Sequence, residues 1–145
     1  GRAVLATREC TFKANKQLGV LVQSGARAEM QGDEVSRNGA HGLCMQLGGV
    51  LAARGCRCRD NKMSAVALLG VGSVGHVTGL NAANNGVDGV HVGQGASLKL
   101  LDSTIEASKR MGLSFSGEGT KANIQRVSVT ESGKYGVLQV AGAEV

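Results

Sequence analysis

Residues 84–92 read NNGVDGVHV, in which Asn85 is followed four residues later by Gly89 and then by apolar residues at alternate positions. Nearly the same phrase occurs at residues 15–22 (NKQLGVLV), 38–45 (NGAHGLCM) and 61–68 (NKMSAVAL). Apolar residues at alternate positions are typical of β-strands, because successive side chains of a strand point to opposite faces. A phrase that recurs at a fixed interval indicates a repeat protein.

The repeat is 23 or 24 residues long and occurs in six copies. A small residue precedes each alternating run, at Gly19, Gly42, Ala65, Gly89, Gly112 and Gly136. Four residues before these anchors stand Asn15, Asn38, Asn61, Asn85, Ser108 and Ser132. A later glycine follows each run, at Gly25, Gly48, Gly72, Gly95, Gly119 and Gly142. Each copy therefore predicts three short strands: before the Asn, after the anchor and after the later glycine.

A repeat of this length with three short strands is one coil of a parallel β-helix, so the predicted fold is an all-β solenoid of about six coils. Equivalent positions of successive coils then stack about 4.8 Å apart. The Asn and Ser positions form a ladder, in which each buried side chain bonds to its copies above and below. We expect residues 1–145 to be a single segment of a longer chain, since the open ends of a solenoid need further coils or caps.

The repeats and their Asn ladder resemble those of the right-handed parallel β-helix proteins, the pectate-lyase-like superfamily. The resemblance covers essentially the whole chain, and it implies that the coil is right-handed. Related repeats also occur in proteins that are not enzymes. The resemblance therefore implies the fold far more than it implies an activity.

The composition suits short strands separated by turns. The chain has 23 Gly, no Pro, no Trp and three aromatic residues, Phe12, Phe115 and Tyr135. Val, Ala and Leu must therefore supply most of the core, and the alternation places Phe12 and Phe115 inside it. The sequence contains no run of about 18 apolar residues, so we expect no insertion into a membrane.

Positive charge is concentrated in the first half of the chain. The net charge is +5, and residues 1–62 hold ten Lys and Arg against five Asp and Glu, whereas residues 63–145 hold six of each. Most of the surplus falls three to six residues before the anchors, at Lys13, Lys16, Arg37, Arg59 and Lys62, and Lys109 extends the line. These residues predict one basic edge, with only Asp60 opposing it.

Such an edge favours an acidic partner. A protein with an acidic surface is the partner we expect, while a purely solvated edge and a glycan ligand stay open as alternatives. Nucleic acid is disfavoured, because proteins that bind single strands usually add stacking aromatic side chains, and this edge has none.

No catalytic residues are predicted. Enzymes that resemble this fold commonly place two or three acids on one face of adjacent coils, whereas only Glu106 and Glu131 are like-charged near neighbours here. The other stacked charges predict cross-coil ion pairs, Glu34 with Arg57, Arg37 with Asp60 and Asp102 with Arg126. The three histidines, His41, His76 and His91, fall at different positions of the repeat and are expected to lie apart. Asp33 falls in a position otherwise mostly apolar, and the pattern gives no reason for it.

The four cysteines predict free thiols. Cys10 and Cys56 share a position two coils apart, about 9–10 Å, which is too far for a disulfide. Cys56 and Cys58 point inward by the alternation, and Cys44 points outward. No second cysteine pair or histidine cluster completes a metal site, so neither a metal nor a cofactor is expected. Unpaired thiols favour a reducing, intracellular compartment.

The sequence thus predicts a non-catalytic structural or protein-interaction scaffold within a larger assembly. One alternative is a carbohydrate-active enzyme, a lyase, hydrolase or epimerase acting on acidic polysaccharide, which would place the protein outside the cell. A second alternative is a carbohydrate-binding module that uses Tyr135 as a stacking platform.

Overall fold

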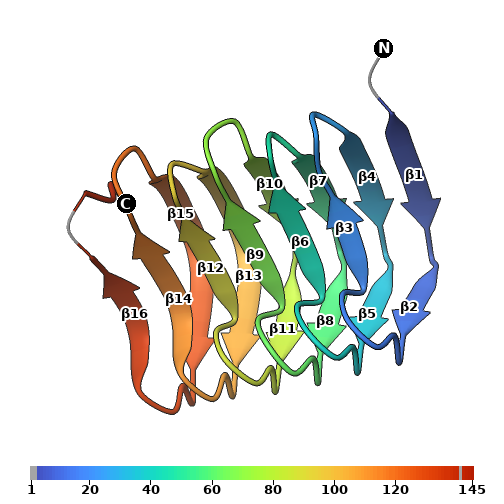
Figure 1. The fold of residues 1–145 in the computed structure, drawn as a ribbon. Helices are drawn as coiled ribbons and strands as arrows, with labels where there is room; N and C mark the ends of the chain where they lie inside the picture. Colours follow the sequence, from blue (N-terminus) through green and yellow to red (C-terminus); the bar gives the residue numbers. More distant parts are fainter. Residues whose placement is uncertain (1–2, 141) are drawn as a thin grey trace.

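The computed structural model describes residues 3–140 and 142–145, and its strands stack into a rod of parallel coils (Figure 1). The described residues form sixteen strands and no helix, so none of them builds a helix that could cross a membrane. Three columns of strands run along the rod, as the repeat predicts. The first column contains β1 (Val4–Arg8), β4 (Arg27–Gln31), β7 (Val50–Arg54) and β10 (Val74–Thr78).

The other two columns follow in each coil. The second contains β2 (Thr11–Lys13), β5 (Glu34–Ser36), β8 (Arg57–Arg59) and β11 (Asn81–Ala83). The third contains β3 (Val20–Val22), β6 (Leu43–Gln46), β9 (Val66–Leu69), β12 (Val90–Gly93), β14 (Met111–Ser116) and β16 (Tyr135–Gln139). In the last two coils the first and second columns merge into single strands, β13 (Ser97–Glu106) and β15 (Lys121–Thr130).

Every strand pairs in parallel with its copy one coil away, which confirms the predicted register. Along the third column the inward positions after the anchors are paired in one line, Val20, Leu43, Val66, Val90, Leu113 and Val137. The third column forms a six-stranded sheet, and the first two columns form a second sheet that β13 joins across the corner. The two sheets face each other across the core (Figure 1).

Two corners of each coil are made by single residues with left-handed backbone. Between the first and second columns this residue is Gly32, Gly55 or Gly79 in the middle coils, with φ of 66°, 63° and 66°. Asp102 and Arg126 adopt the same φ, 51° and 53°, inside the merged strands. A left-handed residue bends the chain at the corner without a loop, which keeps each coil short.

The core is aliphatic, as the composition predicts. Leu43, Leu51, Leu68 and Leu100 are fully buried, and Phe115 is the largest side chain with no exposure. Phe12 packs against this core and is partly buried, so both phenylalanines point inward.

A ladder of asparagines runs along the corner between the second and third columns. Nδ2 of Asn15 donates to Oδ1 of Asn38 (2.9 Å), and the same bond joins Asn38 to Asn61 (2.9 Å) and Asn61 to Asn85 (3.0 Å). Ser108 and Ser132 stack at the same position, but their hydroxyls have no hydrogen-bond partner among the described residues. The hydrogen-bonded part of the ladder therefore ends at Asn85.

The structure explains Asp33, which the repeat pattern did not. Its side chain is fully buried and accepts hydrogen bonds from the Cys10 backbone N–H (2.7 Å) and from Oγ1 of Thr7 (2.5 Å). Ser103 accepts in the same way from the Leu80 backbone N–H (3.0 Å). A polar side chain at this position thus satisfies a buried backbone donor of the preceding coil.

The four cysteines are free thiols, as predicted. Cys56 and Cys58 are buried, as the alternation predicts, and Cys10 is half-buried. Cys44 lies at an outward position of the third column, as the alternation predicts, and only 4% of it is accessible. It pairs with Leu21 and Ala67 on the outer face of the third column, where neighbouring side chains cover so small a group.

Candidate functional site

The six predicted partner-binding residues all have exposed side chains on the corner that carries the Asn ladder. This basic edge comprises Lys13, Lys16, Arg37, Arg59, Lys62 and Lys109. Lys16, Lys62 and Lys109, here called the Lys row, each come directly after a ladder residue. Backbone bonds hold the row in register, from Lys62 N to Asn38 O (3.0 Å) and from Lys109 N to Asn85 O (3.1 Å).

Glycines alternate with the lysines of this row. The intervening coils carry Gly39, Gly86 and Gly133 at the same position. A Cβ added to Gly39 would lie 2.0 Å from the Lys16 carbonyl oxygen, and one added to Gly86 would lie 2.1 Å from that of Lys62. A side chain at these positions would force the stacked coils to shift, which favours lysines two coils apart.

A recess lies between the second and third lysines of the row. It encloses about 440 Å³ and is lined by Asp60, Asn61, Lys62, Asn84, Gly86 and Lys109. Gly86 contributes no side chain, so the space between the two lysine side chains stays open. This Gly86 recess presents two lysine side chains and the exposed amide of Asn84 beside a single carboxylate.

Arg59 of the edge is less available than the lysines. Arg59 lies 3.5 Å and Arg57 lies 3.7 Å from the carboxylate of Glu34. A hydrogen bond from the Ser36 hydroxyl, reinforced by Arg59 and Arg57, lowers the pKa of Glu34 and keeps it charged. Glu34 therefore opposes Arg59 in addition to the predicted Asp60.

Two of the three predicted cross-coil ion pairs form. Besides Glu34 with Arg57, Asp102 pairs with Arg126, whose hydrogen bond lowers the pKa of Asp102. The predicted pair of Arg37 with Asp60 is wrong, since no ion pair joins them among the described residues. Both occupy left-handed corner positions, with φ of 52° and 58°.

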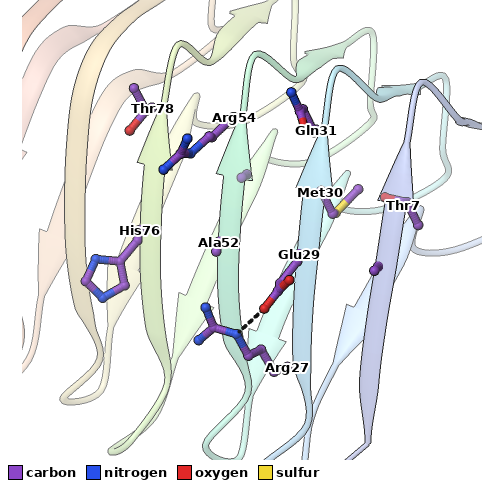
Figure 2. A pocket seen from close by; sticks show the side chains of 11 residues that line it. Thr7, Arg27, Glu29, Met30, Gln31, Ala52, Arg54, His76 and Thr78 are labelled. Carbon is purple, nitrogen blue, oxygen red and sulfur yellow. Dashed lines mark hydrogen bonds and ion pairs between the residues drawn. The ribbon is translucent and has the colours of Figure 1, made fainter.

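A second candidate surface is a shallow groove of about 520 Å³ on the outer face of β1, β4, β7 and β10 (Figure 2). Ala6 and Ala52 form its floor because they are small. Glu29 lies between them and pairs with Arg27 at 3.0 Å. Arg54 and His76 extend from β7 and β10 along the same face (Figure 2). The repeat pattern does not predict this outer groove, since two small outward-facing residues form no recognisable motif.

The outer groove contains basic side chains and only one carboxylate. Its lining residues are Ala6, Thr7, Arg27, Glu29, Met30, Gln31, Ala52, Ala53, Arg54, His76 and Thr78. A pair of acids, which general acid and base catalysis would use, is therefore not present among the residues that line it. The arrangement can hold an anionic group but offers no second carboxylate to move a proton.

A polar row runs along the entrance to the third column. Nδ1 of His41 accepts a bond from the Ser64 N–H (3.1 Å), and Oδ1 of Asp88 accepts one from the Met111 N–H (3.2 Å). Nδ1 of His91 lies 3.8 Å from Oδ2 of Asp88 and 3.3 Å from Oγ of Ser114. These side chains mainly satisfy backbone donors of the next coil.

The histidines are therefore less separate than predicted. Asp88 is buried and acts on both His41 and His91, whereas His76 lies in the outer groove. Burial is the main cause that lowers the pKa of His41 and of His91, and Asp88 opposes it in both. The neutral imidazole of His41 is the form that can accept the Ser64 bond.

Tyr135 is exposed, but its ring is not a bare platform. The amino group of Lys134 lies 5.8 Å from the ring centroid, within cation–π range. Among residues 3–140 and 142–145, no group of three His, Cys, Asp or Glu side chains is placed to hold a metal ion. Glu106 and Glu131 are both exposed, and no ion pair to either is formed within the described part of the chain.

Comparison with known proteins places this geometry in a family. The family described as "Right handed beta helix region" matches residues 2–145. No curated protein matches the sequence.

Two solved structures share the architecture. The pectate lyase Pel9A is 14% identical with a TM-score of 0.71, over 97% of this chain and 47% of its own. The A-module of the mannuronan C-5 epimerase AlgE4 from Azotobacter vinelandii is 11% identical with a TM-score of 0.56, over 98% of this chain and 57% of its own. The chain thus spans about half the length of each, and at these identities the likeness shows the fold alone.

Proposed function

The chain belongs to the right-handed β-helix family, and from that premise we propose that it is a non-catalytic scaffold module that docks an acidic protein partner through its basic edge. The observation that supports this proposal is the Lys row. Lys16, Lys62 and Lys109 are exposed, and no carboxylate of the described residues lies within ion-pair distance of their amino groups. A rigid solenoid holds such charges at fixed intervals, which suits a docking surface.

The non-catalytic part of the proposal rests on the distribution of acids. The outer groove has one carboxylate, Glu29, and Arg27 neutralises it. The buried carboxylates of Asp33 and Asp88 are engaged with backbone N–H groups. No pair of free carboxylates faces a groove in the described part of the chain. An intracellular location stays a prediction, supported by the four free thiols.

Charge reversal of the Lys row tests the docking. In the full-length protein, Lys16, Lys62 and Lys109 are each changed to Glu, and the size of the native assembly is measured in source lysate with crosslinking mass spectrometry. The matched control changes Arg54, Lys99 and Lys121 to Glu, which alters the net charge equally but on the first column, away from the basic edge. We expect the first triple variant to leave the assembly and the control to remain in it. Equal retention of both variants would refute the docking.

The outer groove favours a second candidate, action on or binding of an acidic polysaccharide. Pectate and mannuronan, named in the two similar structures, are both anionic polymers. Arg27 and Arg54 give the groove cationic groups that could pair with sugar carboxylates. The test incubates the full-length protein, with calcium, with polygalacturonate and with polymannuronate. Product formation or binding that is lost in Arg54→Ala, while the Lys row variant keeps it, would favour this candidate over the scaffold.

A further inference from the structure

The Lys row fixes the spacing of the acidic groups that its partner must present. We propose that the row binds an acidic α-helix lying along the rod, with carboxylates seven residues apart, one of them seated in the Gly86 recess. This inference rests on the proposed docking function and specifies the partner. It follows from the alternation of lysine with glycine, since a side chain at this position in the glycine coils would force the stacked coils to shift.

The interval between lysines is two coils, or about 9.6 Å. Seven residues of an α-helix advance about 10.5 Å and return to nearly the same face. The mismatch is about 1 Å per step and about 2 Å over the whole row. The flexible four-carbon stem of lysine can absorb a difference of that size.

An extended strand and a nucleic acid strand repeat their charges at shorter intervals. On one face of an extended strand, side chains repeat every two residues, about 6.6 Å, so they fall out of step with the row at once. Phosphates of a nucleic acid strand follow one another at about 3.4 Å along the axis, and the edge lacks stacking aromatics. On such a helix, the residues three and four positions after each carboxylate residue lie over the intervening glycines.

The recess explains why one carboxylate would meet two lysines. Lys62 and Lys109 line it from two sides, and the Gly86 position between them is open. Asn84, on the exposed corner with φ of 56°, provides an amide group beside the lysines. Asp60 is the one carboxylate of the lining and disfavours an anion placed next to it. The position equivalent to Asn84 in the coils around Gly39 is Arg37, which adds a cation there.

The experiment measures binding of two labelled helical peptides to the full-length protein by fluorescence anisotropy. Both peptides have the same composition. One carries Glu at every seventh position, so that the carboxylates share a face, and the other carries Glu five residues apart, which turns successive carboxylates to different sides. The protein variants are Lys62→Gln with Lys109→Gln, and the control Lys99→Gln with Lys121→Gln. All four lysines are exposed, so none of the changes alters the core.

We expect the peptide with the seven-residue interval to bind more tightly than the other. In the Lys62→Gln, Lys109→Gln protein, the loss of two exposed charge pairs should weaken the affinity for this peptide about tenfold. The affinity of the control protein should stay unchanged. Equal affinity for both peptides would overturn the spacing inference, although docking of an acidic partner would survive. If neither peptide binds and soluble polygalacturonate binds through the Lys row instead, the helical partner is wrong. Failure of the proposed function itself has a different signature, namely an assembly that tolerates charge reversal of the whole row.

Discussion

Asn61 donates from Nδ2 to Oδ1 of Asn85, 3.0 Å away in the next coil, whereas the Ser108 hydroxyl one coil further has no hydrogen-bond partner in the described structure. The corner is therefore stabilised differently along the rod. The first four coils share a continuous amide ladder. The last two instead have merged strands, β13 and β15, which pair over almost their entire length.

Shortening a central ladder residue should destabilise the fold strongly. In Asn61→Ser, the N–H and Nδ2 of Asn38 lose their acceptor, and the Val35 carbonyl loses its donor. Leaving these buried groups unpaired should reduce the free energy of unfolding by about 2 kcal/mol or more, measured by urea denaturation. The control is Asn15→Ser at the exposed start of the ladder, which removes only the Nδ2 donor to Asn38, keeps the backbone donor and should cost less than about 1 kcal/mol. Equal losses in the two variants would mean that the ladder does not stabilise through its buried bonds.

Extending the ladder should have the opposite effect. Ser108→Asn places an amide oxygen where the N–H and Nδ2 of Asn85 could donate to it. The anchor of the preceding coil is Gly89, so the larger side chain meets the same kind of neighbour that Asn61 meets at Gly42. We expect a gain of about 1 kcal/mol in urea denaturation. A loss of stability would show that the corner of the fifth coil is too narrow for an amide.

Glycine in the Lys row is required by backbone contact. An added Cβ in Gly86→Ala would lie 2.1 Å from the Lys62 carbonyl oxygen, and either coil must shift to accommodate it. We expect a loss of about 2 kcal/mol in thermal or urea unfolding. The matched variant is Gly136→Ala, where the nearest atom would be 3.8 Å away, and its stability should change by less than about 0.5 kcal/mol. A small effect at Gly86 would contradict the tight stacking on which the lysine spacing depends.

The repeat predicted the fold well because its signals are local. The positions of Asn38 and Gly42 in the repeat mark the same corner in every coil, and the residue types found there suit that corner. Merging of β13 and β15 was not predicted, because Asp102 and Arg126 replace glycine at a corner and still adopt its φ. The pattern also did not predict the roles of Asp33 and Asp88, since these side chains accept hydrogen bonds from backbone N–H groups of another coil.

The candidate surfaces were predicted less completely. The exposure of the six basic residues follows from their positions in the repeat. The alternation of lysine with glycine is visible in the sequence. It repeats every two coils, however, so an alignment of single coils does not show it as a repeat. The outer groove depends on the small volume of Ala6 and Ala52 beside Glu29, and only the structure reveals which outward positions adjoin.

Thiol reactivity should follow burial. Cys10 is half-buried, whereas Cys44, Cys56 and Cys58 are buried, and burial raises the pKa of each of these three thiols. A thiol that is both buried and protonated reacts slowly. In the native protein a thiol-specific reagent should therefore label Cys10 first, with all four labelled after denaturation, as followed by mass spectrometry. Labelling of Cys58 as fast as Cys10 would indicate that the coils open readily.

Stability should fall in mild acid because two half-buried histidines are held neutral. Burial lowers the pKa of His41 and His91, so below about pH 6.5 the unfolded chain binds protons that the folded chain does not. Their contribution to the free energy of unfolding is thus complete above that pH and is lost as the pH falls toward the lowered pKa values. The free energy of unfolding cannot change by more than about 1.4 kcal/mol per pH unit for each histidine. Protonation of His41 also removes the acceptor of the Ser64 N–H.

The variant His41→Asn separates this contribution from other acid effects. Its amide oxygen can accept the Ser64 bond and cannot be protonated in this range. In urea denaturation between about pH 5 and 7.5, the free energy of unfolding of His41→Asn should depend on pH less steeply than that of the native chain. The difference should be at most about 1.4 kcal/mol per pH unit, which corresponds to one proton. If His41→Asn keeps the native pH dependence, His41 does not couple folding to pH, and the acid sensitivity must come from His91.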